Sequence, residues 1–291
     1  MSQLLAQTAA GWSFTDRGSG EPIVLLHGLG TDSSAWDRVV PALADHHRVI
    51  TVDLPGYSLR SVVDRVPHAT ELADGLDRLL AGLGIESAVL VGHSFGGAVS
   101  LITAHRHPRR CAGLVLVAPG GFGAELNPVI PLLGSRLGSR LLGSLYGPRT
   151  SRTIERLAAR VEERPPRDSR LRIAELMETY DRLRTEQARA QFRAGVQRSL
   201  ALNTASERAE YARIDPNVPV LILWGREDRV LPSWHAKNAA KLIPWALVHV
   251  IDGAGHTPHR SHARRTAREI TGFAESGDVL RRLGRVSPPG S

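Results

Sequence analysis

Cysteine is almost absent from this chain of 291 residues, in which Cys111 is the only one. A single thiol cannot form an internal disulfide, and the lack of a disulfide framework favours a reducing compartment. No run of about 18 apolar residues occurs, which argues against a membrane-spanning helix. The first residues also lack the basic start and the long apolar stretch of a signal peptide. We therefore expect a cytoplasmic protein without stable membrane insertion.

Lysine is also scarce: Lys237 and Lys241 are the only two, so the net charge of +8 is almost entirely due to arginine. The arginines are scattered singly or in pairs, without interleaved aromatics, which favours a solvated surface over nucleic-acid binding. No His, Cys and Asp residues have metal-ligand spacing. The glycine-containing segment 18–22 lacks the helix and lysine of a phosphate loop. We expect neither a metal nor a cofactor, and the oligomeric state stays open.

Short apolar runs alternate with helical patterns along the chain. Six runs of Val, Ile and Leu without polar alternation are typical of strands buried on both faces of a parallel sheet. They are Pro22–Leu26, Arg48–Val52, Ala88–Val91, Gly113–Val117, Val218–Trp224 and Ala246–Ile251. Helical spacing is found at Ala69–Leu83, Gly97–His105, Ser233–Leu242 and Ala263–Ala274. This order predicts an α/β fold with a doubly wound, mostly parallel sheet, whose sites lie at the carboxyl ends of the strands.

The alternation stops between about Pro119 and Asp215, where helical spacing and many charges continue for roughly 90 residues. Such a segment is too long for a loop, so we expect an inserted helical lid with an apolar inner surface. The Pro-, Gly- and Ser-containing end of the chain is typical of disorder. The predicted organisation is a first core part at 1–119, a lid at 120–214, a second core part at 215–276 and a flexible tail at 277–291.

The stretch VGHSFGG at 91–97 places Ser94 among glycines, directly behind a predicted strand and before a predicted helix. One interpretation is a glycine-rich turn in which Ser94 caps the next helix. The other is a Gly-x-Ser-x-Gly nucleophile on a tight bend, where the backbone N–H of Phe95 can point at developing negative charge.

Five motifs occur in the order seen in α/β-hydrolase fold serine hydrolases, and the sequence resembles that superfamily from about residue 10 to 275. The motifs are IVLLHGLG at 23–30, VDLPGYS at 52–58, VGHSFGG at 91–97, LILWGREDRVLP at 221–232 and IDGAGHTPH at 251–259. The resemblance implies an enzyme of the esterase, thioesterase or carbon–carbon hydrolase type, and it makes the predicted sheet an α/β-hydrolase fold.

The resemblance also implies a catalytic triad. It gives Ser94 as nucleophile, Asp228 as acid and His256 as base, in the chain order that this fold needs. Glu227 is expected to face elsewhere, and His259 is the alternative base. In such a triad the carboxylate orients the imidazole, which takes the proton of the serine.

The oxyanion hole is expected to consist of the backbone N–H groups of Leu29 and Phe95. Candidate substrate contacts are Gly28 and Trp36, near the first of these donors, and Tyr146 in the lid. His27 is expected to be a packed structural residue.

The predicted function is cleavage of a small to medium, largely apolar carboxylic ester or thioester, a small-molecule substrate, through an acyl-enzyme. The first alternative is a carbon–carbon bond hydrolase, or a biosynthetic acyltransferase or cyclase, with the same triad. The segment APGGFG at 118–123 is similar to carbon–carbon hydrolases, although Thr257 stands where these usually carry tryptophan. The second alternative is a non-catalytic ligand-binding protein on the same fold.

Overall fold

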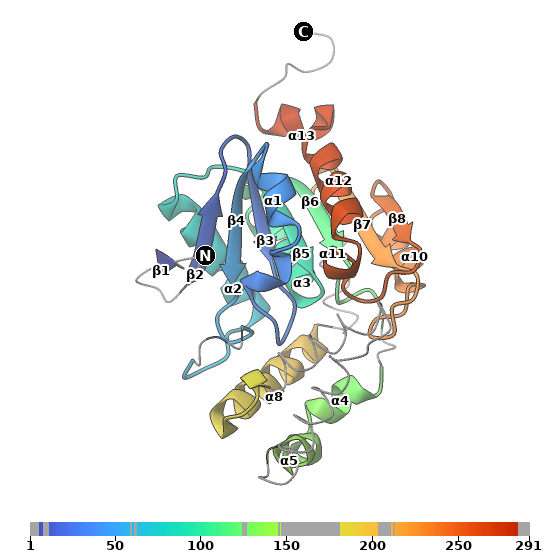
Figure 1. Cartoon of the computed structure of the whole chain (residues 1–291). Coiled ribbons are helices and arrows are strands. Elements are labelled where there is room, and N and C mark those ends of the chain that lie inside the picture. The colour runs from blue at the N-terminus through green and yellow to red at the C-terminus, as the bar shows by residue number, and fades with distance from the viewer. Residues whose placement is uncertain are drawn as a thin grey trace, which may run out of the picture.

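A computed structural model describes the backbone of residues 6–7, together with residues 12–58, 60, 63–123, 127–144, 146, 181–202, 211 and 213–284. Its centre is an eight-stranded sheet in the order β1-β2-β4-β3-β5-β6-β7-β8 (Figure 1). The strands are β1 Ala6–Gln7, β2 Ser13–Arg17, β3 Pro22–Leu26, β4 Arg48–Asp53, β5 Ala88–His93, β6 Cys111–Val117, β7 Val220–Gly225 and β8 Leu247–Ile251. Strands β3 to β8 pair in parallel, and β1 and β2 are antiparallel.

Helices cover both faces of the sheet, which confirms the predicted fold class. The helical elements of the core are η1 Ser33–Trp36, α1 Val40–Ala44, α2 Ala69–Gly82, α3 Phe95–Arg106, η2 Pro108–Arg110, α10 His235–Leu242, α11 Pro258–Ser261, α12 Ala263–Ala274 and α13 Gly277–Arg282. One apolar core lies between the sheet and α2, α3 and α10. The other lies beneath η1, α1, α12 and α13. Along β3, Val24 and Leu26 enter the first core while Ile23 and Leu25 enter the second, so the strand is apolar on both faces.

Three further helices lie beyond one end of the sheet: α4 Val129–Leu133, α5 Arg136–Ser144 and α8 Glu186–Ala201 (Figure 1). Helices α4 and α8 share a small apolar cluster in which Leu183, Phe192 and Val196 are buried. These helices fall inside the predicted lid at 120–214. Much of that segment lies outside the described residues, so its bounds, and those of the core parts at 1–119 and 215–276, stay predictions.

The prediction of a flexible tail at 277–291 is wrong for the first half of that segment. Residues 277–282 form α13, and its Val279 is fully buried against β6 and Phe273 of α12. Arg282 adds a hydrogen bond from its Nε atom to the carbonyl oxygen of Cys111, at 3.2 Å. One buried apolar side chain thus anchors a helix too short to give a periodic pattern. Residues 285–291 lie outside the described residues.

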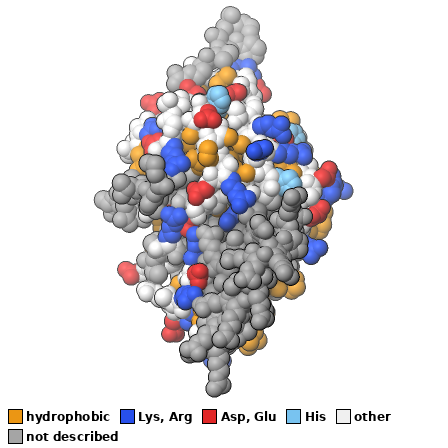
Figure 2. All heavy atoms as spheres, in the orientation of Figure 1, with side chains coloured by type: hydrophobic (Ala, Val, Ile, Leu, Met, Phe, Trp, Pro, Cys, Tyr) orange, Lys and Arg blue, Asp and Glu red, His pale blue; other side chains and the backbone are white. Residues whose placement is uncertain are grey.

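The described surface carries charges of both signs, and the single thiol lies in the core. On the face that Figure 2 shows, Lys and Arg side chains are interspersed with Asp and Glu. Cys111 is buried at the start of β6, and burial raises the pKa of its thiol to about 12. None of the described helices has the length and hydropathy needed to cross a lipid bilayer.

Candidate active site

Ser94 lies on a strained bend between β5 and α3. Its φ of 51° is in the left-handed region, which non-glycine residues seldom adopt. The two flanking glycines of the motif make the bend fit: a Cβ on Gly92 would lie 2.3 Å from the carbonyl oxygen of Gly96, and one on Gly96 would lie 2.5 Å from that of His27. The Ser94 side chain makes no capping hydrogen bond to α3. The bend therefore presents a hydroxyl that helix capping does not use.

The structure brings Ser94, His256 and Asp228 together. Nε2 of His256 lies 3.1 Å from Oγ of Ser94, and its Nδ1 lies 2.8 Å from Oδ2 of Asp228. The other carboxylate oxygen, Oδ1, accepts the N–H groups of Val230 and Leu231 at 2.8 and 2.9 Å. Because two backbone N–H groups hold Oδ1, the carboxylate is oriented independently of its bond to the imidazole. Nδ1 of His256 then donates to Asp228, which leaves Nε2 to accept the Ser94 proton.

Backbone contacts hold the loops that carry the acid and the base together. The N–H of Glu227 donates to the carbonyl oxygen of Ala254 at 2.9 Å, and that of Arg226 donates to Ile251 at 3.0 Å. The Glu227 side chain is exposed, as predicted, whereas that of Asp228 is buried. Asp252 pairs with Arg226 at the surface. The loop after β7 and the loop after β8 therefore form one unit beside Ser94.

Leu29 and Phe95 both line the cavity next to Ser94. Among the described residues, neither backbone N–H donates a hydrogen bond to a protein acceptor. The loop of Leu29 is fixed by His27, whose Nδ1–H donates to the carbonyl oxygen of Gly28 at 2.7 Å while its Nε2 accepts from Leu54 at 2.9 Å. Burial lowers the pKa of His27, which agrees with a neutral, structural imidazole. Two N–H groups are thus left free to stabilise an oxyanion.

A buried carboxylate ties this loop to the lid helices. Asp32 caps η1 by accepting the N–H of Ser34 at 2.8 Å, and its Oδ2 pairs with Arg60 at 2.8 Å and with Arg182. Burial alone would raise the pKa of Asp32, but the bonds from Arg60 and Ser34 outweigh it and lower the pKa to about 2. The sequence analysis did not identify this cluster, because its members are far apart along the chain.

The cavity beside Ser94 has a volume of about 210 Å³ and a mostly apolar wall. The lid contributes Ile130, Leu133, Phe192, Val196, Ser199, Leu200 and Leu202 to its lining. The other lining residues are Leu29, Thr31, His93, Ser94, Phe95, Ala98, Gly120, Gly121, Val230, Leu231, His256 and Thr257. No lining residue among those described is Asp, Glu, Lys or Arg.

Two predicted substrate contacts are wrong. The Trp36 ring is fully buried in the core beneath η1 and α12, where it packs against His259 with ring centroids 4.4 Å apart. Tyr146 packs on the lid cluster beneath Arg189, and neither residue lines the cavity. Gly28 lies beside the site instead of lining it, since a Cβ there would lie 3.2 Å from Cβ of Ser94. His259 has no contact with Ser94 that would make it the base.

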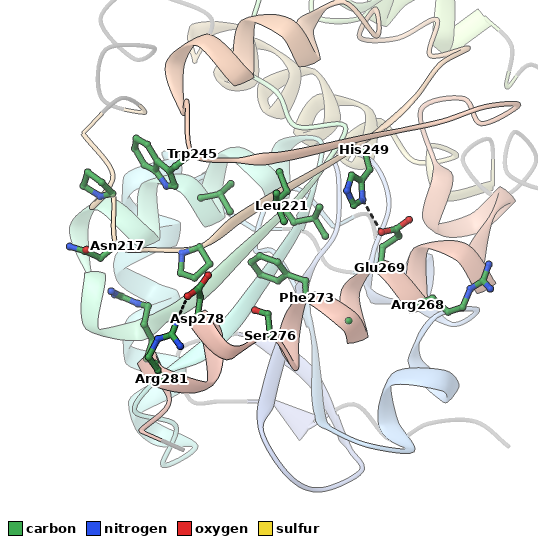
Figure 3. A pocket seen from close by; sticks show the side chains of 16 residues that line it. Asn217, Leu221, Trp245, His249, Arg268, Glu269, Phe273, Ser276, Asp278 and Arg281 are labelled. Carbon is green, nitrogen blue, oxygen red and sulfur yellow. Dashed lines mark hydrogen bonds and ion pairs between the residues drawn. The ribbon is translucent and has the colours of Figure 1, made fainter. Parts of the chain in front are cut away.

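A larger groove, of about 720 Å³, lies along the first residues of β7 and β8, away from Ser94 (Figure 3). Two pairs of ionisable side chains lie in it: His249 is 2.8 Å from Glu269, and Arg281 pairs with Asp278. Among the described residues that line this groove, no hydroxyl side chain is hydrogen-bonded to a histidine. Among the described residues no cluster of His, Cys, Asp and Glu could hold a metal ion.

Comparison with known proteins identifies the family of this fold. Residues 21–263 match the model of the alpha/beta hydrolase fold family. The chain belongs to the alpha/beta hydrolase fold family. The chain is 31% identical over 269 residues to a 2-hydroxy-6-oxononadienedioate/2-hydroxy-6-oxononatrienedioate hydrolase of Pseudomonas putida, covering 90% of this chain and 91% of the relative.

Solved alpha/beta hydrolase structures share the fold. A meta-cleavage product hydrolase from Pseudomonas fluorescens IP01 superposes with a TM-score of 0.71 at 24% identity, covering 90% of this chain and 93% of that one. A thermophilic esterase from Thermogutta terrifontis gives 0.67 at 23% identity, covering 94% and 97%. This alpha/beta hydrolase is therefore an enzyme with both carbon–carbon bond hydrolases and esterases among the proteins it resembles.

Proposed function

We propose that this alpha/beta hydrolase is a serine hydrolase that cleaves a small to medium, apolar carboxylic ester or thioester. The observation that carries the proposal is the continuous chain of hydrogen bonds from Asp228 through His256 to Ser94, at 2.8 and 3.1 Å, beside an apolar cavity. A non-catalytic binding protein would not need a strained Ser94 within bonding distance of a base.

The geometry performs acyl transfer in two halves. Nε2 of His256 takes the proton of Ser94 as Oγ attacks the substrate carbonyl carbon. The carbonyl oxygen becomes an oxyanion held by the N–H groups of Leu29 and Phe95. His256 then protonates the departing alcohol or thiol, which leaves an ester on Ser94. Water, deprotonated by the same imidazole, attacks this ester and releases the carboxylic acid and the free serine. Throughout, Asp228 holds Nδ1–H and stabilises the imidazolium.

The cavity lining favours an uncharged acyl group. Burying a carboxylate without a partner is costly, and the described lining offers no arginine or lysine to pair with one. The cavity is also below the usual range for drug-sized ligands, about 300–1,000 Å³, which favours a short acyl chain.

The second candidate is a carbon–carbon bond hydrolase that uses the same three side chains. It is favoured by the 31% identity to the Pseudomonas putida hydrolase, which is named for dicarboxylate substrates. A biosynthetic acyltransferase or cyclase would use the same acyl-enzyme with a different acceptor.

The test is hydrolysis of p-nitrophenyl esters from acetate to decanoate by the wild type and by Ser94→Ala, with fluorophosphonate labelling in parallel. We expect ester hydrolysis and labelling that are both lost in Ser94→Ala. A wild type that labels yet cleaves only a vinylogous diketone would favour the carbon–carbon hydrolase. A wild type that neither labels nor turns over any of these compounds would contradict the triad.

A further inference from the structure

His93 precedes Ser94 at the end of β5, and its side chain contacts the loop that carries His256. Nε2 of His93 lies 2.9 Å from the backbone carbonyl oxygen of His256. A carbonyl oxygen can only accept, so Nε2 carries the proton and donates it. The two imidazole rings lie 4.9 Å apart between centroids and are tilted by 55°. The bond thus fixes the main chain of the same residue whose ring faces Ser94.

A second edge of the His93 ring, formed by Nδ1 and Cε1, faces the loop of Leu29. A Cβ on Gly28 would lie 2.7 Å from Nδ1 of His93, so only a glycine leaves room for the ring in this position. One imidazole therefore touches the loops on both sides of Ser94. The ring occupies the space that Gly28 leaves, and its Nε2–H donates to the main chain of His256.

The protonation state of His93 suits this bond. The residue is 3% exposed, and burial, followed by the neighbouring His259 and His256 rings, holds the pKa of His93 well below its usual value. The ring is therefore neutral near pH 7. With the proton on Nε2, Nδ1 has no proton to donate, and it has no hydrogen-bond partner among the described residues. The bond from Nε2 to His256 is therefore the single hydrogen bond of the His93 ring within the described part of the chain.

We propose that His93 is a positioning residue, which holds the main chain of His256 so that its Nε2 stays within reach of Ser94 Oγ. This inference rests on the proposed function for its effect on catalysis. Misplacement of a reacting group by about 1 Å can cost about 100-fold in rate, so one backbone bond at the base has a large effect.

His259 provides a matched control in the same stack of rings. It is fully buried, and its ring lies 4.4 Å from that of His93 and 4.4 Å from that of Trp36. Within the described part of the chain, neither of its nitrogens has a hydrogen-bond partner. His259 thus shares the packing of His93 but lacks the bond to His256.

The experiment compares His93→Leu, His93→Gln and His259→Phe with the wild type. The leucine removes the donor, and the glutamine keeps an N–H near the position of Nε2. We expect kcat for the best p-nitrophenyl ester to fall at least about tenfold in His93→Leu, with KM within about twofold. We expect His93→Gln to recover most of that loss and His259→Phe to stay within about threefold of the wild type. Thermal unfolding of each variant shows that it is folded.

Hydrogen exchange of residues 252–262, followed by mass spectrometry, measures the position of the His256 loop without any substrate. We expect faster exchange of this segment in His93→Leu than in His259→Phe or the wild type. Equal exchange in folded His93→Leu and wild type would overturn the proposal. Equal losses of kcat in His93→Leu and His259→Phe would do the same, because packing would then explain both. A wild type without hydrolysis or labelling would overturn the proposed function, and the exchange rates would still decide the role of His93 in holding the loop.

Discussion

The α-carbon of Gly225, at the end of β7, faces the carbonyl oxygen of Gly255, and a Cβ on Gly225 would lie 2.1 Å from that oxygen. Gly225 precedes the loop of Asp228, and Gly255 precedes His256. The contact is between two backbones, so neither side can move away by changing a rotamer. The close approach of these glycines is therefore what lets the acid and the base meet.

Gly225→Ala is expected to separate these two loops. We predict a loss of more than about 2 kcal/mol in unfolding free energy and a fall in ester hydrolysis, measured by urea unfolding and steady-state kinetics. Gly272→Ala is the control, because Gly272 is an exposed position in α12 with open space around it. That variant should gain up to about 1 kcal/mol and keep its activity. Equal stability of the two variants would contradict the contact.

Asp228→Asn is expected to preserve the shape of the site and to abolish most of its catalytic activity. The amide oxygen can still accept from Val230 and Leu231, which turns the NH₂ group toward His256. The imidazole must then accept at Nδ1 and carry its proton on Nε2, where it can no longer take the Ser94 proton. We predict a fall in kcat/KM of about 10³- to 10⁴-fold. Glu227→Gln, at the exposed neighbour, should leave kcat/KM unchanged, and a comparable loss there would contradict the assignment of the acid.

Leu133→Ala is expected to lengthen the acyl chain that the enzyme accepts. Leu133 lines the cavity from α4, while the adjacent Leu132 is 40% exposed and does not line it. Removing three carbon atoms from the wall should raise the ratio of octanoate to butanoate hydrolysis by about tenfold. Leu132→Ala should leave this ratio as in the wild type. If both variants change it equally, the cavity is not the acyl site.

His259 is expected to make the fold sensitive to mild acid. Burial lowers the pKa of His259 to about 3 from an ordinary 6.5. Between these pH values His259 is protonated in the unfolded chain and neutral in the folded chain. Stability is then complete above pH 6.5 and falls by up to about 1.4 kcal/mol per unit as the pH drops toward 3. At pH 5 the loss is about 2 kcal/mol, and His259→Phe should remove it.

Urea unfolding at pH 7.5 and pH 5 measures this difference. The control His46→Asn replaces a histidine that is exposed in the folded chain, so its loss of stability between the two pH values should match the wild type. An unchanged pH dependence in His259→Phe would show that the ring is protonated in the folded state.

The sequence predicts the central strands and the site far better than the edges. The bounds of β3 and α12 are those expected. A continuous apolar run marks the strand, and a regular helical period marks the helix. Strand β2 was not predicted: in Ser13–Arg17 only Phe14 is a large apolar residue, and pairing with β4 holds the strand. Local pattern cannot reveal a strand whose stability comes from its partner.

Within the site, too, some residues could be predicted from the sequence and others could not. Ser94, Asp228 and His256 follow from motifs whose glycines and strand ends fix the local backbone. Trp36 is close to Leu29 along the chain, yet it lies in the core beneath η1 and α12, whereas Leu29 packs against the core on the other face of the sheet. Closeness in sequence does not show which face of the sheet a side chain lies on. Phe192 of α8 packs against Gly30, where a Cβ would lie 2.8 Å from the phenyl ring. This contact depends on how the lid helices pack against the core, so the local sequence does not predict it.

Two parts of the chain contribute residues to this site, one before and one after the lid helices. Ser94 and both N–H donors belong to residues before 124, whereas Asp228 and His256 belong to residues after 212. A chain divided between these parts would yield two polypeptides, one with the nucleophile and one with the acid and base, neither able to turn over substrate alone. Fusing each half to one of two interacting proteins would then make ester hydrolysis a reporter of their association.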